Sequence, residues 1–340
     1  MASTTEGRTA GEAPSLSEPL PATVAYRSIR LLRLVDETAD RLARAGEMGV
    51  HVPCRGQEAL LAGVAAATRA GDWLMPGPRQ SSIGLLRGLS LVSHFSQLLG
   101  RSADPSRGRQ APGHPTVRSL NLFSVATPVG SQLIQAAGVG LAMKRAERGE
   151  VAVTLGGAGA VATADFHVGM NFTALWAVPV VHVFAVATDD RSELPGPAAR
   201  AAAHGLHAVE VDGADARAVH DTMAAAMERA RSGEGPTLVE ASFPEPLRVT
   251  PESGLRLVGD SDETSWSEVD PLERCRRDSG LAAADADAID AELQSAVDDG
   301  VAAALALPAP PTSLLFDDVF AERTPALEAQ RREWLAQRKN

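Results

Sequence analysis

A glycine-rich stretch near the middle of the chain has the residue types of a ligand-binding turn. An apolar run at 151–155 leads into Gly156-Gly157-Ala158-Gly159. A helix is expected over 160–176, and a second apolar run covers 180–186. Strand, glycine turn, helix and strand make a βαβ unit with parallel strands. Because open α/β sheets bind ligands at the carboxyl ends of their strands, the turn predicts a ligand site.

The same turn has a second interpretation, a dinucleotide fingerprint. Residues 157–162 read GAGAVA and fit the pattern G-x-G-x-x-A, and Asp189 and Asp190 end the next strand. In dinucleotide-binding folds the acid follows about 20 residues on, whereas Asp189 lies 32 residues after Gly157. The spacing favours a closely packed strand-to-helix turn.

Three arginines, Arg79, Arg107 and Arg109, have the chemistry to bind a phosphate or a carboxylate. The alternative is that they are solvated or paired with the acidic excess of the chain. His114, in the same loop as Arg109, is expected at the surface. The Arg-, Gly- and Pro-rich loop 104–116 is long enough to suggest a functional or mobile segment.

Other reactive residue types have structural interpretations. His182 falls within a buried strand and is expected to be a hydrogen-bonded core histidine. Asp165, near a helix start, suggests a cap or a structural ion pair, and Asp317-Asp318 suggests a solvated turn. Cys54 and Cys275 are expected to be free thiols, since neither has the neighbours of a nucleophile or a metal site.

Composition limits the classes of protein that fit. The 340 residues are 44% hydrophobic and 22% charged, which is ordinary for a globular protein. The net charge of −11 argues against a general nucleic-acid binder. Because no apolar run is long enough for a membrane span and the N-terminus has no signal-peptide core, a cytoplasmic protein is expected.

The surrounding pattern predicts an α/β fold with a mostly parallel sheet and helices on both faces. Helices and strands alternate between residues 50 and 243, as in a doubly wound domain. We expect a disordered arm at 1–21, an α/β domain with N-terminal helices at 22–266 and a helical region at 267–340. Helices are expected at 23–46, 56–69, 132–144, 199–204, 216–231, 270–278 and 286–307. Further strands are expected at 72–76, 209–211 and 236–241, and residues 314–320 are expected to be extended before a polar terminal helix.

Several phrases, in order, resemble a known family: the alpha subunit of the decarboxylating (E1) component of thiamine-diphosphate-dependent 2-oxo acid dehydrogenases. The branched-chain type is the most similar, and the pyruvate type belongs to the same family. The resemblance covers nearly the whole chain after the arm, and it implies a thiamine-diphosphate-binding fold. The matching phrases are GQEALLAGVAAA, DWLMPGPR, GRQAPGHP, ATPVGSQLIQAAGVGLAMK, ADFHVGMNFTALWAVPVV, VDGADARAV, RARSGEGPTLVEA and LLFDDVFAE.

The resemblance implies thiamine diphosphate and Mg²⁺ as cofactors, but this chain departs from the family at the metal ligands. The family holds the metal with a Gly-Asp-Gly turn and an Asn-Asn pair, which supply the oxygen ligands that magnesium needs. The corresponding side-chain positions here are Ala158 and Ala187, and the family's backbone ligand falls at Asp189. Since methyl groups cannot coordinate a metal, this chain is predicted to have no metal site.

The positions for the diphosphate are also altered. A Tyr-Arg pair of the family falls at Pro78-Arg79, and a family arginine falls at Ala185. The loop that carries histidine in the family reads FPEPLR here, at 243–248, and an earlier loop histidine falls near Ser81. The cofactor contacts that the resemblance still implies are Arg79, Thr127, Val129, Gly157, Gly159 and Asp189.

Two further sets of residues follow from the resemblance. Thr127, Pro128, Ser131 and Gln132 resemble the family's monovalent-cation loop. Arg109 and His114 belong to a polar loop near the cofactor site and form a possible anion site.

The resemblance also implies partners: a beta-type subunit in an α2β2 assembly, and an acyltransferase component of a multienzyme complex. Three hypotheses about activity remain open. The chain is a degenerate, non-catalytic subunit, which the combined losses favour. Alternatively, it supports thiamine-dependent oxidative decarboxylation of a branched-chain 2-oxo acid or pyruvate. In the third hypothesis, the vacated pocket binds another anionic ligand through Arg79 and Arg109.

Overall fold

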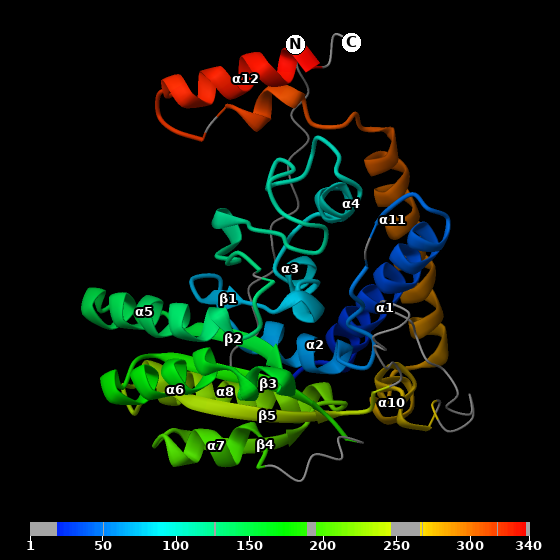
Figure 1. Cartoon of the computed structure of the whole chain (residues 1–340). Helices are drawn as coiled ribbons and strands as arrows, with labels where there is room; N and C mark the ends of the chain where they lie inside the picture. Colours follow the sequence, from blue (N-terminus) through cyan, green and yellow to red (C-terminus); the bar gives the residue numbers. More distant parts are fainter. Residues whose placement is uncertain are drawn as a thin grey trace, which may run out of the picture.

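A parallel sheet forms the centre of the molecule (Figure 1). The computed structural model describes residues 19–49, 51–125, 127–188, 195–245, 266, 268–317 and 319–337. The sheet has five strands in the order β1-β2-β3-β5-β4, and every neighbouring pair is parallel. The strands are β1 (Trp73–Met75), β2 (Ala152–Gly157), β3 (Val180–Ala187), β4 (His207–Asp212) and β5 (Thr237–Phe243).

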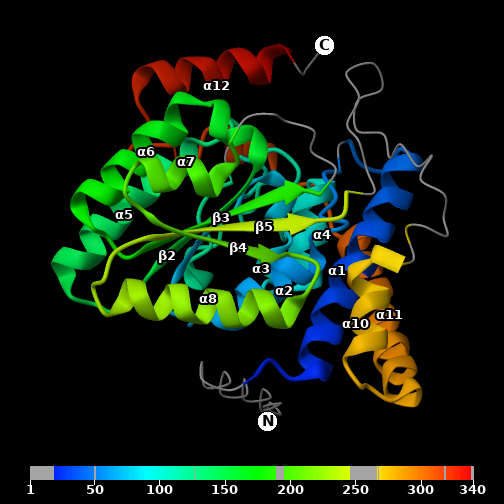
Figure 2. The ribbon, with the colours of Figure 1, turned by 90° about the horizontal axis from the view of Figure 1, so that it is seen from below.

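Helices cover both faces of this sheet, as Figure 2 shows. On one face, α2 (Glu58–Ala67) and α8 (Ala216–Arg231) pack on each other and share a core with the strands. On the other face lie α5 (Ser131–Ala146), α6 (Ala164–Trp176) and α7 (Pro197–Ala203). The predicted α/β class, with a mostly parallel sheet and helices on both faces, is therefore confirmed.

The contact between α2 and α8 depends on a glycine. A Cβ atom on Gly63 would lie 2.6 Å from Val219 Cγ1 and 2.7 Å from the carbonyl oxygen of Ala216. Such distances are shorter than van der Waals contact, so the two helices approach closely only because Gly63 has no side chain.

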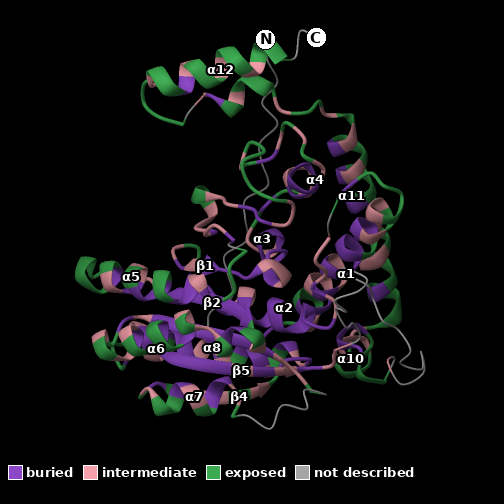
Figure 3. Ribbon diagram, in the orientation of Figure 1, coloured by how far each residue is buried: buried purple, intermediate pink, exposed green. Residues whose placement is uncertain are grey.

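Helices from the two ends of the chain lie side by side. The N-terminal helix α1 (Ala22–Arg44) contacts α10 (Pro271–Asp278) and α11 (Ala283–Ala306), and α11 also contacts α4 (Leu91–Leu99). The short helix α3 (Ile83–Leu86) precedes α4. The last helix, α12 (Pro325–Gln337), lies beyond α4 and is mostly exposed (Figure 3). The first 18 residues of the predicted arm lie outside the described residues, and Leu20 is buried.

A buried ion cluster joins these end helices. Arg33 in α1 donates to Asp270 with both Nη atoms, at 2.9 and 2.8 Å, and its Nε donates to Glu58 Oε1 at 2.6 Å. All three side chains are at most 6% exposed. Asp270 also caps α10 by accepting from the Leu272 amide. Burial opposes the charge on Asp270, but Arg33 outweighs burial and lowers the pKa of this carboxyl group.

Predictions about local structure are wrong in two segments. The helix expected from residue 160 begins at Ala164, after the 3-10 helix η3 (Ala158–Ala162). Thr163 is its cap, because its hydroxyl accepts from the Phe166 amide; Asp165 lies in the first turn and is not the cap. The second error concerns residues 314–320: a 3-10 helix, η4 (Thr312–Leu315), covers the start of the segment expected to be extended.

His182 is the core histidine that the sequence predicts. On β3 it is fully buried, and its two ring nitrogens lie 2.8 Å from Thr154 Oγ1 and 3.2 Å from Thr173 Oγ1. Burial lowers the pKa of His182 to about 3. Burial, reinforced by nearby His51, likewise lowers the pKa of His94 to about 4. Both side chains are therefore neutral in the folded protein at moderately acidic pH.

We expect stability to fall as the pH drops from about 6.5 towards 4. In that range the histidines of the unfolded chain, whose pKa is about 6.5, bind protons. The buried histidines of the folded chain stay neutral, so protonation favours the unfolded state. His182 alone contributes a slope approaching about 1.4 kcal/mol per pH unit. Urea unfolding at pH 7, 6 and 5 measures it. The variant His182→Gln should show a smaller change of unfolding free energy with pH. The control His207→Gln, at an exposed position, should keep the slope of the unaltered protein. Equal slopes in the unaltered protein and both variants would contradict the interpretation.

Both cysteines are free thiols, as expected. Burial raises the pKa of Cys275 to about 11 and also raises that of fully buried Cys54. Neither is therefore a thiolate nucleophile at neutral pH. Among the described residues, no helix is both long and apolar enough to cross a membrane.

Candidate functional site

A hollow of about 380 Å³ opens at the carboxyl ends of the central strands. Its walls come from the ends of β2, β3 and β5, from the 3-10 helix η1 (Pro78–Gln80) that follows β1, and from the start of α5. This is the edge of the sheet at which the glycine turn predicts a ligand site. The turn lines the hollow with residues 156–160, including Gly157 and Gly159.

The hollow presents methyl groups where the family resemblance implies metal ligands. Ala158 and Ala187, which occupy those two positions, both line it, as does Ala185. Val129, which is 59% exposed, and Phe243 add further apolar surface. Magnesium requires oxygen ligands, so the side chains at these two positions cannot hold a metal-bound diphosphate.

Acidic residues elsewhere do not replace the missing ligands in the part of the chain that is described. No group of three or more His, Cys, Asp or Glu residues there could hold a metal ion. Asp189, the implied backbone ligand, and Asp190 lie outside the described residues, as does Asp318. Asp317 pairs instead with Arg323, which together with a Ser313 hydrogen bond lowers its pKa.

Arg79, which the family resemblance implies as a diphosphate contact, is occupied by contacts within the chain. Its Nη1 and Nη2 donate to the two carboxylate oxygens of Glu245, at 2.9 and 3.1 Å. Its Nε donates to the Pro53 carbonyl at 3.2 Å, and Nη2 donates to the Arg55 carbonyl at 3.3 Å. The guanidinium carbon also lies 5.5 Å from the centre of the Phe243 ring. The positive charge at the rim is thus neutralised by a carboxylate.

Three glutamines supply the remaining polar side chains of the hollow. Gln80 Nε2 donates to Gln57 Oε1 at 2.6 Å, and Gln132 Nε2 donates to the Leu155 carbonyl at 3.0 Å. All three are buried. Gln57, Gln80, Phe243 and Glu245 were not among the residues predicted to form the site. Gln57 belongs to a family-like phrase, but no local signal pairs Glu245 with Arg79, which lies 166 residues away.

The other implied cofactor and cation-loop residues lie at the start of α5. Ser131 donates through its hydroxyl to the Pro128 carbonyl at 3.0 Å, which closes the turn before the helix. The Thr127 hydroxyl lies 3.3 Å from His114 Nε2. Val129 and Gln132 line the hollow, but Thr127, Pro128 and Ser131 do not.

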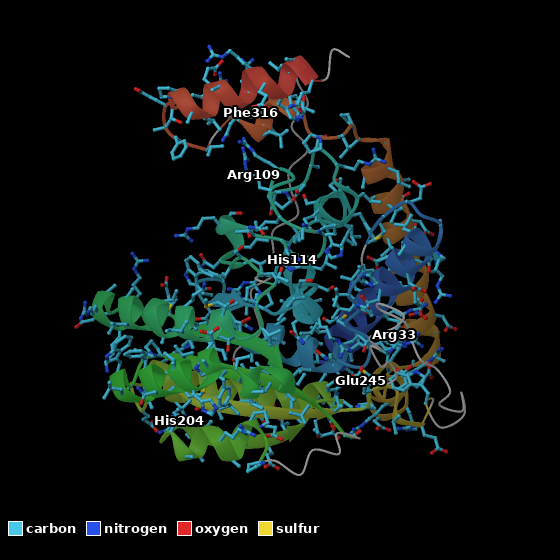
Figure 4. All side chains as sticks on the ribbon, in the orientation of Figure 1. Arg33, Arg109, His114, His204, Glu245 and Phe316 are labelled. Carbon is cyan, nitrogen blue, oxygen red and sulfur yellow. The ribbon has the colours of Figure 1, made fainter. Side chains whose placement is uncertain are left out.

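Arg109 and His114, the residues of the possible anion site, each have partners within the chain. Arg109 donates to the carbonyl oxygens of Leu314 and Asp317, at 2.9 and 2.7 Å, and so binds the C-terminal segment. Figure 4 shows Arg109 beside Phe316, far from Glu245. The expectation that His114 lies at the surface is wrong: it is 9% exposed, and its Nδ1 lies 2.9 Å from the Pro112 carbonyl. Its backbone amide also donates to the Ala111 carbonyl at 3.1 Å, and its position in a loop of the sequence does not reveal these contacts.

Comparison with known proteins identifies relatives of the chain. A family model described as "Dehydrogenase E1 component" matches residues 26–243. The chain is 31% identical over 332 residues to 3-methyl-2-oxobutanoate dehydrogenase subunit alpha of Mycobacterium tuberculosis, with 92% of this chain and 86% of the relative covered. It is 31% identical over 265 residues to 2-oxoisovalerate dehydrogenase subunit alpha of Bacillus subtilis, with 75% of this chain and 78% of the relative covered.

Solved structures agree with the fold. Transketolase from Campylobacter jejuni is similar, with a TM-score of 0.50 at 16% identity. The match covers 82% of this chain but only 46% of that enzyme, so the chain spans about half its length. This likeness supports the expected thiamine-diphosphate-binding type of fold. The family match and the two alpha-subunit relatives place the chain in the dehydrogenase E1 component family, among the alpha subunits of 2-oxo acid dehydrogenases.

Proposed function

We propose that this chain is a non-catalytic alpha-type subunit that pairs with a beta-type partner. The observation that carries the proposal is the pair of methyl groups, Ala158 and Ala187, in the wall of the hollow. Two methyl groups in place of a carboxylate and an amide remove two oxygen ligands from a metal that needs about six. The parallel sheet and the helices on both of its faces are present around them.

Exposed apolar side chains support the pairing. Ile134 in α5 and Val168 and Leu175 in α6 are 37%, 39% and 69% exposed, and these two helices pack against each other. Contiguous exposed apolar patches mark protein interfaces, and these three side chains come from two neighbouring helices. We therefore propose an α2β2 assembly. Size-exclusion chromatography with light scattering on the co-expressed alpha and beta chains tests it; two separate peaks at the monomer masses would rule it out.

A second candidate function is thiamine-diphosphate-dependent oxidative decarboxylation of a branched-chain 2-oxo acid or pyruvate. The hollow favours it, because a space of about 380 Å³ persists at the carboxyl ends of the strands. In this case backbone groups, water or the beta partner would supply the metal ligands. The names of the relatives from Mycobacterium tuberculosis and Bacillus subtilis point to a branched-chain substrate.

Calorimetric titration of thiamine diphosphate with Mg²⁺, into the chain alone and into the alpha–beta pair, separates these functions. We expect no binding signal in either case, because the side-chain ligands are absent. The double variant Ala158→Asp, Ala187→Asn should regain a signal that depends on the metal. The control Ala162→Asp, Ala187→Asn places the same charge on an exposed residue outside the hollow and should not. A stoichiometric, metal-dependent signal with the unaltered pair would contradict the non-catalytic proposal and favour the enzymatic function instead.

A further inference from the structure

Arg79 and Glu245 form an ion pair at the rim of the hollow, apart from the positions of the lost metal ligands. Arg79 is the retained cation of the diphosphate position, and Glu245 follows the end of β5 (Figure 4). The carboxylate faces the guanidinium in the two-pronged geometry that a phosphate would otherwise adopt. Glu245 therefore holds the place of an anion.

The contacts leave Arg79 little capacity for a second ligand. A guanidinium has five N–H donors, and four hydrogen bonds reach Glu245, Pro53 and Arg55. The side chains of Arg79 and Glu245 are only 28% and 14% exposed. An incoming phosphate must displace the carboxylate and then sit beside its negative charge. Repulsion between like charges a few ångströms apart makes that exchange unfavourable.

We propose that Glu245 is a built-in anion that occupies Arg79 and closes the hollow to diphosphates and other phosphate esters that carry no bound metal ion. With the pair neutral and the walls formed by Ala158, Ala187, Val129 and Phe243, the hollow is suited to an uncharged ligand. This inference depends on the proposed function in taking Arg79 as the family's diphosphate arginine. It adds a second reason why phosphate groups do not bind in the hollow, and this reason does not involve a metal ion.

A rival role for Glu245 predicts the opposite behaviour. If its carboxylate replaced the missing metal ligands, Mg²⁺-dependent binding of thiamine diphosphate would require it, and Glu245→Gln would abolish that binding. In the built-in anion role, Glu245→Gln frees the Arg79 donors and creates binding. The bidentate contact favours the second role, because both carboxylate oxygens already accept from Arg79.

The test is calorimetric titration of inorganic pyrophosphate, without metal, into the full-length chain. We expect no measurable binding to the unaltered protein and at least a tenfold gain in affinity for Glu245→Gln. The smaller neutral replacement Glu245→Ser should behave in the same way, and Arg79→Ala with Glu245→Gln should lose the gain. The matched control Glu234→Gln removes the same charge from an exposed pair with Arg229 and should change nothing.

Each outcome decides between the roles. Binding of pyrophosphate to the unaltered chain that is lost in Arg79→Ala would overturn the proposal, as would folded Glu245→Gln and Glu245→Ser proteins that bind none. These results are independent of the metal-dependent titration that tests the proposed function. A chain that binds thiamine diphosphate only with Mg²⁺ and a beta partner would contradict that function, and the pyrophosphate titration would still report on Glu245.

Discussion

Replacing Asp270 by alanine is expected to lower the free energy of unfolding by about 3–5 kcal/mol. The reason is the buried cluster in which Asp270 accepts two hydrogen bonds from Arg33. Without this carboxylate, Arg33 stays buried with Glu58 as its remaining acidic partner. The change also removes the cap of α10, which accepts from the Leu272 amide.

Urea unfolding monitored by circular dichroism measures this effect. The matched control is Asp287→Ala, because Asp287 also pairs with an arginine, Arg276, but its side chain is 69% exposed. Exposed pairs contribute about 0–1 kcal/mol, so the control should stay close to the unaltered protein. A loss in Asp270→Ala no larger than in the control would show that the buried cluster does not hold the end helices.

Replacing Gly63 by alanine is expected to destabilise the protein by about 1–3 kcal/mol, although alanine is the better helix former. The new methyl group would meet Val219 and the carbonyl oxygen of Ala216 at 2.6–2.7 Å. The backbone of α8 must move to admit it. Since α2 and α8 cover one face of the sheet, the cost falls on the main core.

The same substitution at Gly138 should have the opposite sign. Gly138 lies within α5, and a Cβ atom there has nothing within 4 Å. Alanine should therefore stabilise the helix by about 0.5–1 kcal/mol. Thermal unfolding of the two single variants compares them directly. If both variants shift the melting temperature in the same direction, close packing at Gly63 does not limit stability.

Much of the fold could be predicted because its signals are local. Continuous apolar runs predict β2 and β3, and helical spacing predicts α8 with its exact bounds, Ala216–Arg231. The errors occur where one side chain decides between alternatives. The hydroxyl of Thr163 caps α6, so this helix begins at Ala164. The apolar residues at 314–315 belong to a 3-10 helix, although their composition suggests a strand.

Less of the candidate site could be predicted from the sequence, because its main contact, between Arg79 and Glu245, joins residues 166 positions apart. The family resemblance places Ala158, Ala187 and Arg79 in one region, and all three line the hollow. It does not indicate that Glu245 turns back onto Arg79, or that Arg109 binds the carbonyls of Leu314 and Asp317. A carboxylate in a Pro-rich segment has many surface arginines as possible partners, and only the path of the chain selects one.

The contact between Arg33 and Asp270 also constrains the order of events during synthesis. The two residues are 237 positions apart, so at about 5–20 residues per second a ribosome makes Arg33 roughly ten to fifty seconds before its partner. All five strands of the sheet are translated in that interval. During that interval the sheet strands have been synthesised, but Arg33 in α1 has no contact with Asp270. A chaperone that covers α1 would have this period in which to act.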